Sequence, residues 1–178
     1  WCLYLLARAP EWQQRIRDEV IAVAGNAPIE SAHIDQLPTT QRVLKETMRL
    51  YPPAPVLSRM AANATTLGGR ALRPGTNVVM PVFAIHRHKR LWEDPDRFDP
   101  DRFLPEREAR YWRTQFMPFG AGPRICIGMS FAMAEATAIL ATLVRSASFE
   151  WDGRYVPEPL SRVTLRPKGG MPLRVHLL

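Results

Sequence analysis

The stretch FGAGPRICIG at residues 119–128, followed by a long apolar run, most constrains what this chain can fold into. It places Cys126 at the end of a glycine-bearing loop, directly before the apolar residues 127–144. That run predicts a buried helix, because it is broken only by small residues, a serine and one glutamate. A thiolate at this position would receive backbone N–H groups from the loop and the positive end of the helix dipole.

Glycines and an arginine surround the cysteine at short, defined spacings. Gly120, Gly122 and Gly128 suit turns with positive φ, or a flat partner that lies against the backbone. Arg124, two residues before the cysteine, can meet a carboxylate through a charge-assisted hydrogen bond. The loop therefore combines one soft ligand, close backbone approach and one cation.

Cys126 by itself is open to a simpler interpretation, since a lone cysteine at a helix start is in general a small buried apolar residue. The full spacing F-x-x-G-x-R-x-C-x-G is more specific, and it resembles the haem-thiolate loop of the cytochrome P-450 superfamily at every fixed position. The resemblance implies that Cys126 is the axial thiolate ligand of a haem iron, with haem b (iron protoporphyrin IX) as the cofactor. Further cofactor-binding residues are implied by position in the motif: Phe119, Gly120, Gly122, Arg124 and Gly128.

Two more stretches match the family upstream of the loop. Residues 45–53, KETMRLYPP, resemble the E-x-x-R helix and the proline turn after it. Glu46 and Arg49 lie one helical turn apart, which alone indicates an exposed ion pair of little energetic weight. The resemblance implies instead that the pair is buried and structural. Residues 99–103, DPDRF, resemble the P-E-R-F element with Asp in place of Glu, and Arg102 would complete a network with the pair.

Residues 54–85 have the composition of β-structure, with turns at 67–70 and 74–75 and a strand at 76–82. The resemblance places Arg59 on a haem propionate, although an ordinary strand-surface arginine is the alternative. It also implies substrate-side residues here and in a C-terminal hairpin: Ala54, Val56, Leu57, Val163 and Thr164.

The run HRHK at residues 86–89 holds two histidines, His86 and His88. Two metal ligands without a third are a weak site, so an exposed basic turn is the better interpretation. The family usually has an acid where His88 stands, followed by a short helix. The change removes a helix cap at that point.

The length and the order of these patterns define the fold class. A chain of 178 residues can bury one sizeable core. We interpret residues 1–178 as a single partial domain, mainly α with small β-sheets (α+β), that forms the C-terminal part of the cytochrome P-450 fold. The start at Trp1, within apolar helical sequence, predicts a piece of a longer protein.

The charge and the cysteines exclude several classes of protein. The net charge of +7 is scattered, and no nucleic-acid recognition motif accompanies it, so an acidic partner or anionic cofactor groups account for it better. Cys2 and Cys126 are far apart, which argues against a disulfide scaffold and favours a reducing, cytoplasmic location. Glu135 in the apolar run argues against a membrane span. An anchor upstream of Trp1 stays open.

The resemblance implies a parent enzyme that is an O₂-dependent monooxygenase of apolar organic substrates. Its electrons would come from a ferredoxin, flavodoxin or flavoprotein reductase docked on the basic side facing Cys126. The family's distal helix, with its acid–Thr pair, has no counterpart in these residues, so we expect the chain alone to be incomplete. The alternatives are a peroxygenase-like or non-catalytic haem-binding protein, and a structural remnant that binds nothing.

Overall fold

The computed structural model describes all of residues 1–178. The helices, in chain order, are α1 (Cys2–Ala7), α2 (Pro10–Ala24), the 3-10 helix η1 (Ser31–Gln36), α3 (Pro38–Leu50), α4 (Val82–Ile85), η2 (Pro100–Phe103), α5 (Pro105–Glu108), η3 (Gly122–Arg124) and α6 (Met129–Ser146). The strands are β1 (Leu57–Met60), β2 (Thr65–Leu67), β3 (Arg70–Leu72), β4 (Asn77–Met80), β5 (Ala147–Glu150), β6 (Pro159–Ser161), β7 (Leu165–Pro167) and β8 (Arg174–Leu177). The predicted class is confirmed: a helical body carries four small antiparallel sheets, which pair β1 with β4, β2 with β3, β5 with β8 and β6 with β7.

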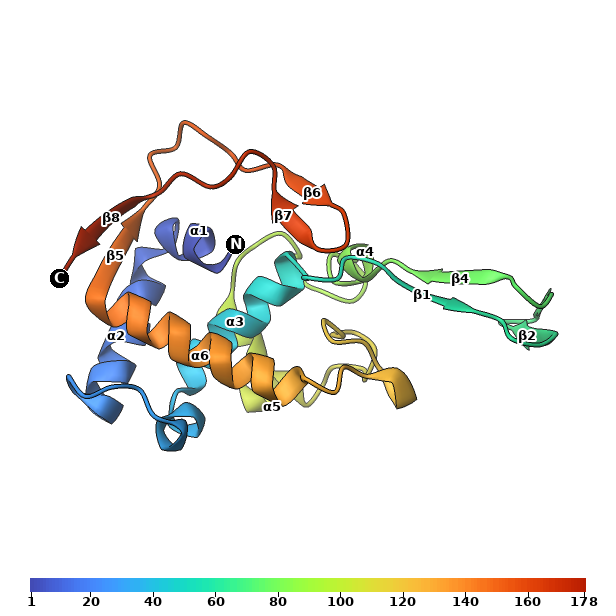
Figure 1. Cartoon of the computed structure of the whole chain (residues 1–178), viewed down its shortest axis with the longest axis horizontal. Coiled ribbons are helices and arrows are strands. Elements are labelled where there is room, and N and C mark those ends of the chain that lie inside the picture. Colours follow the sequence, from blue (N-terminus) through green and yellow to red (C-terminus); the bar gives the residue numbers. More distant parts are fainter.

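The hydrophobic core lies where α1, α2, α3 and the C-terminal half of α6 pack together with β5 (Figure 1). Helix α2 shows why: Trp12, Ile16 and Val20 recur at helical spacing and are all buried. Proline opens this helix and Gly25, at φ +53°, ends it. The core residues are Leu6, Ala9, Trp12, Ile16, Val20, Leu37, Val43, Leu140, Ala141, Val144, Ala147 and Phe149.

Helix α6 is not the fully buried helix that the apolar run predicts. Its buried residues, Thr137, Leu140, Ala141 and Val144, lie from the middle of the helix onward, whereas Phe131 near its start is 73% exposed. The reason is its position: the first half of α6 runs past α3 and away from the core, toward the cysteine loop (Figure 1). None of the helices combines the length and the hydrophobicity that crossing a bilayer requires.

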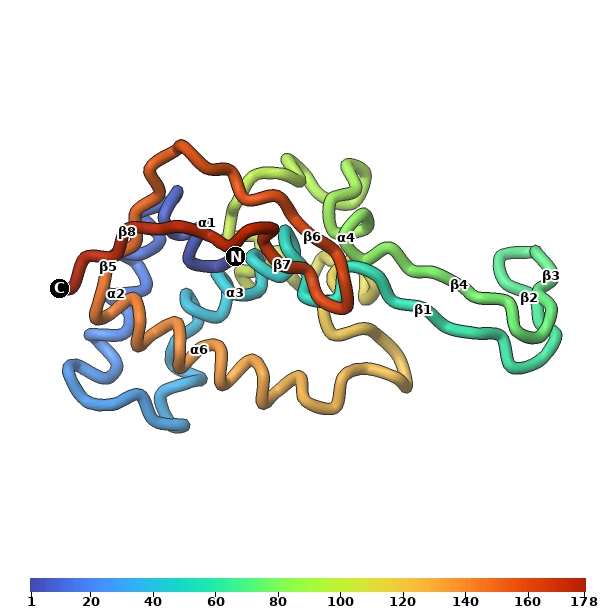
Figure 2. Tube along the Cα trace, turned by 45° about the horizontal axis from the view of Figure 1, so that its top comes forward, coloured from blue at the N-terminus to red at the C-terminus, as the bar shows by residue number.

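The sheet region after α3 is a ribbon that projects from the helical body. Strands β1 and β4 form its length and the β2–β3 hairpin its tip, as Figures 1 and 2 both show. The predicted strand at 76–82 is too long, because β4 ends at Met80 and α4 follows. Pro81 explains the stop, since it has no N–H to continue the ladder.

The C-terminal segment crosses back over the helical body instead of forming consecutive hairpins. Strand β5 pairs with β8, and β6 and β7 form a hairpin between them in sequence. This hairpin is tied to the turn after α3, because the Leu165 N–H donates to the Pro53 carbonyl at 3.0 Å. The Trp1 Nε1–H also donates to the Leu165 carbonyl, at 3.2 Å, and so holds the same strand of the hairpin.

Candidate functional site

The cysteine loop is held closed by its own backbone. The Cys126 N–H donates to the Phe119 carbonyl at 2.9 Å, and the Gly120 N–H donates to the Met117 carbonyl at 3.0 Å. The 3-10 turn η3 lies between them and brings the chain back, so that the thiol of Cys126 is free and exposed. The loop thus presents one soft sulfur ligand on a backbone that is already fixed.

Two of the three loop glycines have the expected backbone geometry. Gly120 has φ +80° and Gly122 has φ +74°, a region that other residues enter at a cost. Gly128 lacks the positive φ, since its φ is −86°, so only close approach of a flat partner stays a prediction for it. It occupies the N-cap of α6, where a helix begins from negative φ and no glycine is required.

The surroundings of the thiol are apolar and open. Ile127, directly after the cysteine, is 104% exposed, and Ile125 is 46% exposed. On another side of the loop, a cavity of about 500 Å³ is lined by Phe119 and Gly120 together with Met48 from α3, and Cys126 does not line it. Cys126 is therefore exposed and lies outside this cavity.

The two arginines expected near the propionates are both available cations. Arg124 is exposed and forms no ion pair, and Arg59 is exposed on β1, where its Nη1 donates only to the Ser58 carbonyl at 2.8 Å. No carboxylate of this chain neutralises either side chain. Both remain free to meet an anionic group.

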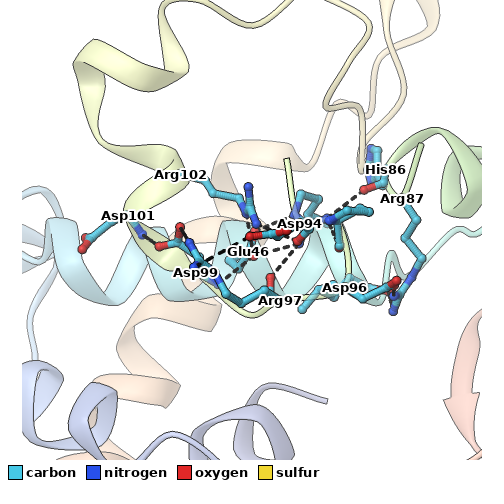
Figure 3. Close-up of polar contacts among 12 residues, drawn as sticks. Glu46, His86, Arg87, Asp94, Asp96, Arg97, Asp99, Asp101 and Arg102 are labelled. Carbon is cyan, nitrogen blue, oxygen red and sulfur yellow. Dashed lines mark hydrogen bonds and ion pairs between the residues drawn. The ribbon is translucent and has the colours of Figure 1, made fainter. Parts of the chain in front are cut away.

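The ion network around Glu46 is buried, and Figure 3 shows its side chains converging from three segments. Arg49 donates two hydrogen bonds to the carboxylate, from Nε to Oε2 at 2.7 Å and from Nη2 to Oε1 at 2.8 Å. Neither side chain has any exposed surface. Arg102 Nε lies 3.4 Å from Oε1, which is a charge contact without hydrogen-bond geometry. The Asp99 N–H donates to Oε1 at 2.9 Å. The structure therefore brings the three predicted network residues together.

Desolvation opposes charge in this network, and the surrounding donors compensate. Burial raises the pKa of Glu46, while Arg49, the Asp99 N–H and Arg102 favour its charged form. Burial acts in the same direction on Asp99, but the Arg97 hydrogen bond and the charges of Arg102 and Arg107 hold the pKa of that carboxyl below its usual value. Arg49 also donates from Nη1 to the carbonyls of His86 and Pro95, at 2.8 and 2.7 Å. Helix α3 is thus tied to the chain that leads to the cysteine.

The residues expected on the substrate side fall into two segments, which the Leu165–Pro53 hydrogen bond joins. In the first, Val56 is 51% exposed, and Leu57 lies so close to the loop that a Cβ on Gly120 would be 3.6 Å from its Cδ1. In the second, Val163 is 92% exposed at the tip of the β6–β7 hairpin. The remaining two, Ala54 and Thr164, lie beside them in the chain, half-buried and exposed.

His86 is the residue that the sequence interpretation missed. It was expected in an exposed turn, but it has no exposed surface, and its Nε2 accepts the Met117 N–H at 3.0 Å. The apolar residues directly before it, which form α4, are the signal that could have marked it as buried. His88 is exposed as expected; its Nδ1 accepts the Arg90 N–H at 3.2 Å, and turns stand where the family's short helix was expected.

The chain thus combines a buried Glu46–Arg49 network with an exposed, free cysteine on a glycine-bearing loop. The family model described as Cytochrome P450 matches residues 1–174. The chain is 43% identical over 97% of its length to a cytokinin hydroxylase of Arabidopsis thaliana, and 37% identical over 100% to an 11-oxo-beta-amyrin 30-oxidase of Medicago truncatula. The chain belongs to the cytochrome P450 family. It spans 34% of the length of each of these two relatives.

The residues present fit the haem cofactor that this family implies. The free thiol is a soft ligand, as an iron–thiolate bond requires. Ile125 and Ile127 supply exposed apolar surface beside it, and the positive-φ glycines keep side chains away from the loop backbone. Arg124 and Arg59 supply unpaired cations for carboxylates.

Proposed function

We propose that this chain is the thiolate-donating, haem b-binding portion of an O₂-dependent monooxygenase that hydroxylates an apolar organic substrate. The observation that carries the proposal is Cys126: a free, exposed thiol whose own amide is held by the Phe119 carbonyl at 2.9 Å. The relatives' names, a hydroxylase and an oxidase, support the reaction type. Dioxygen activation would be supplied by haem bound there, with thiolate donation favouring O–O cleavage.

The chain's own residues would orient the cofactor and set the electronic state of the sulfur. Cys126 would hold the haem iron through its thiolate, while Phe119, Gly120 and Gly122 would shape the hydrogen bonds that reach the sulfur and so tune its potential. Gly128 lies next to the sulfur, since a Cβ there would be 3.9 Å from it, and leaves the space beside the thiolate open to the cofactor. Arg124 and Arg59 pair with the propionates and fix the rotation of the ring.

The substrate side is proposed to be Ala54, Val56, Leu57, Val163 and Thr164. Exposure of Val56 and Val163 supports an apolar substrate, because apolar surface takes up apolar groups most favourably. Val163→Phe is expected to alter KM and the product distribution while leaving the thiolate spectrum unchanged. An unchanged product distribution and KM would remove the β6–β7 hairpin from the pocket.

We propose an acidic electron-donor protein, a ferredoxin, flavodoxin or flavoprotein reductase, as the partner on the loop's basic side. Arg113 lines the cavity beside Gly120 and Gly122, is exposed and forms no ion pair, which supports this orientation. Arg113→Glu should slow reduction at low salt, whereas Arg162→Glu on the β6–β7 hairpin should not. Equal rates in the two variants would contradict the docking face. A cytoplasmic location stays a prediction from cysteine usage.

The decisive experiment is the spectrum of the reduced, CO-treated protein in its longest natural form. Thiolate ligation gives a Soret band far to the red, and Cys126→Ala should abolish that band. Cys2→Ala is the matched control, because burial raises the pKa of the Cys2 thiol to about 11 and keeps it protonated. A thiolate band that survives in Cys126→Ala would overturn the proposed function.

A further inference from the structure

One residue, His86, connects the buried ion network to the cysteine loop through its backbone carbonyl and its imidazole. His86 follows α4 and has no exposed surface. Its backbone carbonyl accepts Arg49 Nη1 at 2.8 Å, and its ring Nε2 accepts the Met117 N–H at 3.0 Å. Phe116 packs against the ring, with the two centroids 5.3 Å apart. His86 therefore contacts Arg49 of the ion network through its carbonyl and Met117 before the cysteine loop through its ring.

Two backbone hydrogen bonds carry this connection from Met117 to the cysteine. The Met117 carbonyl accepts the Gly120 N–H at 3.0 Å, which closes a tight turn. Phe119, inside that turn, offers the carbonyl that accepts the Cys126 N–H at 2.9 Å. A displacement of Met117 would therefore move the group that holds the cysteine amide.

The hydrogen bond from Met117 requires one particular form of the imidazole. Nε2 accepts an N–H only when it carries no proton, so the neutral ring must hold its proton on Nδ1. Burial lowers the pKa of His86 to about 4, and the Arg49 charge acts in the same direction, against the carbonyls of Met48 and Arg49. The ring is therefore neutral near pH 7, with a buried Nδ1 that has no hydrogen-bond partner.

We propose that His86 is a positioning residue for the thiolate: its Nε2 fixes the Met117 amide and thereby sets the place of the Cys126 amide relative to the Glu46–Arg49 network. This inference rests on the proposed function, because the position of Cys126 matters for chemistry only if it ligates iron. A residue that orients a ligand from outside the coordination sphere affects both the metal's affinity and its potential.

The test compares two substitutions of similar polarity that differ in reach. In His86→Gln the side-chain oxygen lies near the position of Nε2 and can accept the Met117 N–H, whereas in His86→Asn it lies near the position of Nδ1 and falls short. His88→Asn, at an exposed histidine two residues away, is the control. All variants are made in the longest natural form of the protein, loaded with haem.

Two measurements report on the link. Hydrogen exchange of the peptide that contains the Met117 amide should be at least tenfold faster in His86→Asn than in the native protein, His86→Gln and His88→Asn. Haem should be lost roughly tenfold more readily from His86→Asn, with a raised reduction potential and a larger fraction of reduced-CO protein without the thiolate band, as expected for loss of an orienting contact. Rescue by His86→Gln separates positioning from simple packing.

Equal behaviour of His86→Asn and His86→Gln in both measurements would overturn the inference. So would a change of the same size in His88→Asn. The proposed function fails separately, through a thiolate band that persists in Cys126→Ala. Exchange of the Met117 amide does not depend on haem, so it still reports on the hydrogen bond in that case.

Discussion

The network around Glu46 and the loop around Cys126 differ in burial, because the first is enclosed by the chain and the second is exposed. At Glu46 the carboxylate receives three hydrogen bonds from Arg49 and Asp99, and no part of it is exposed. At Cys126 the backbone is equally well held, but the sulfur and its apolar neighbours face outward. The buried polar network fixes how α3 and the segment after it pack together, whereas the exposed loop leaves the Cys126 thiol available to a cofactor.

The largest expected effect is a difference in activity between residues 1–178 expressed alone and the longest natural form. Both are loaded with haem and supplied with reductant, O₂ and a panel of fatty acids and terpenes. We expect no hydroxylated product from residues 1–178 alone, because the apolar surface beside Cys126 stays open to water, and an active site that admits water loses reducing equivalents. Mass spectrometry of the products checks this, with the longest natural form as the control. Product in proportion to reductant consumed would show that the chain is sufficient.

Removing the buried partner should be the most costly single substitution. Glu46→Ala leaves the Arg49 and Arg102 charges unpaired, which should lower the free energy of unfolding by about 3–5 kcal/mol. Glu158→Ala is the matched control: its ion pair with Lys168 is 2.9 Å long but exposed, so its loss should change the free energy of unfolding much less. Urea unfolding measures both. Losses of equal size would place Glu46 in a surface pair.

The pH dependence of stability separates the buried imidazole from the exposed ones. Because the folded pKa of His86 is about 4 and its ordinary value is 6.5, the unfolded chain takes up the proton first as the pH falls. Stability from this group is therefore complete above pH 6.5, declines toward pH 4 and then levels off. The loss amounts to about 3 kcal/mol at about 1.4 kcal/mol per pH unit. Urea unfolding of the native protein against His86→Gln between pH 7 and 4 gives the difference, and parallel curves would contradict a buried neutral His86.

The smallest expected changes in stability come from alanine substitutions of two loop glycines, Gly122 and Gly128. Gly122→Ala should cost about 1–2 kcal/mol, because its φ of +74° is unfavourable for alanine even though nothing lies within 4 Å of the added Cβ. Gly128→Ala has negative φ and only the sulfur nearby, so its stability should change by about 0.5 kcal/mol or less. Thermal unfolding of the haem-free protein checks the pair. If Gly128→Ala lost more stability than Gly122→Ala, the positive φ of Gly122 would not be the source of the cost.

Local patterns predicted much of the fold. The apolar run at 127–144 predicted the helix α6, and the glycines at 68 and 69 lie in the predicted turn at 67–70, which joins β2 to β3. The predictions failed where burial or strand pairing depends on segments that are distant in sequence. The apolar run at 127–144 was expected to be buried throughout, but the core reaches only the second half of α6. The pairing of β5 with β8 joins strands with the whole β6–β7 hairpin between them, which no local pattern reveals.

The sequence by itself determined the family, because the ten-residue loop pattern around Cys126 is local and can be found without knowing how the chain folds. The spacing of Glu46 and Arg49 alone indicated an exposed pair, and only the resemblance implied that it is buried. The burial of His86 was decided by the tertiary structure alone. Glu46 lies on a helix face that looks polar, and its partners Asp99 and Arg102 lie more than fifty positions further along the chain. His86 lies in a run that looks like a basic surface turn, and it becomes an interior acceptor only because Met117 folds back onto it. Burial depends on what packs against a residue from elsewhere, and a side chain's own neighbours in sequence carry little of that information.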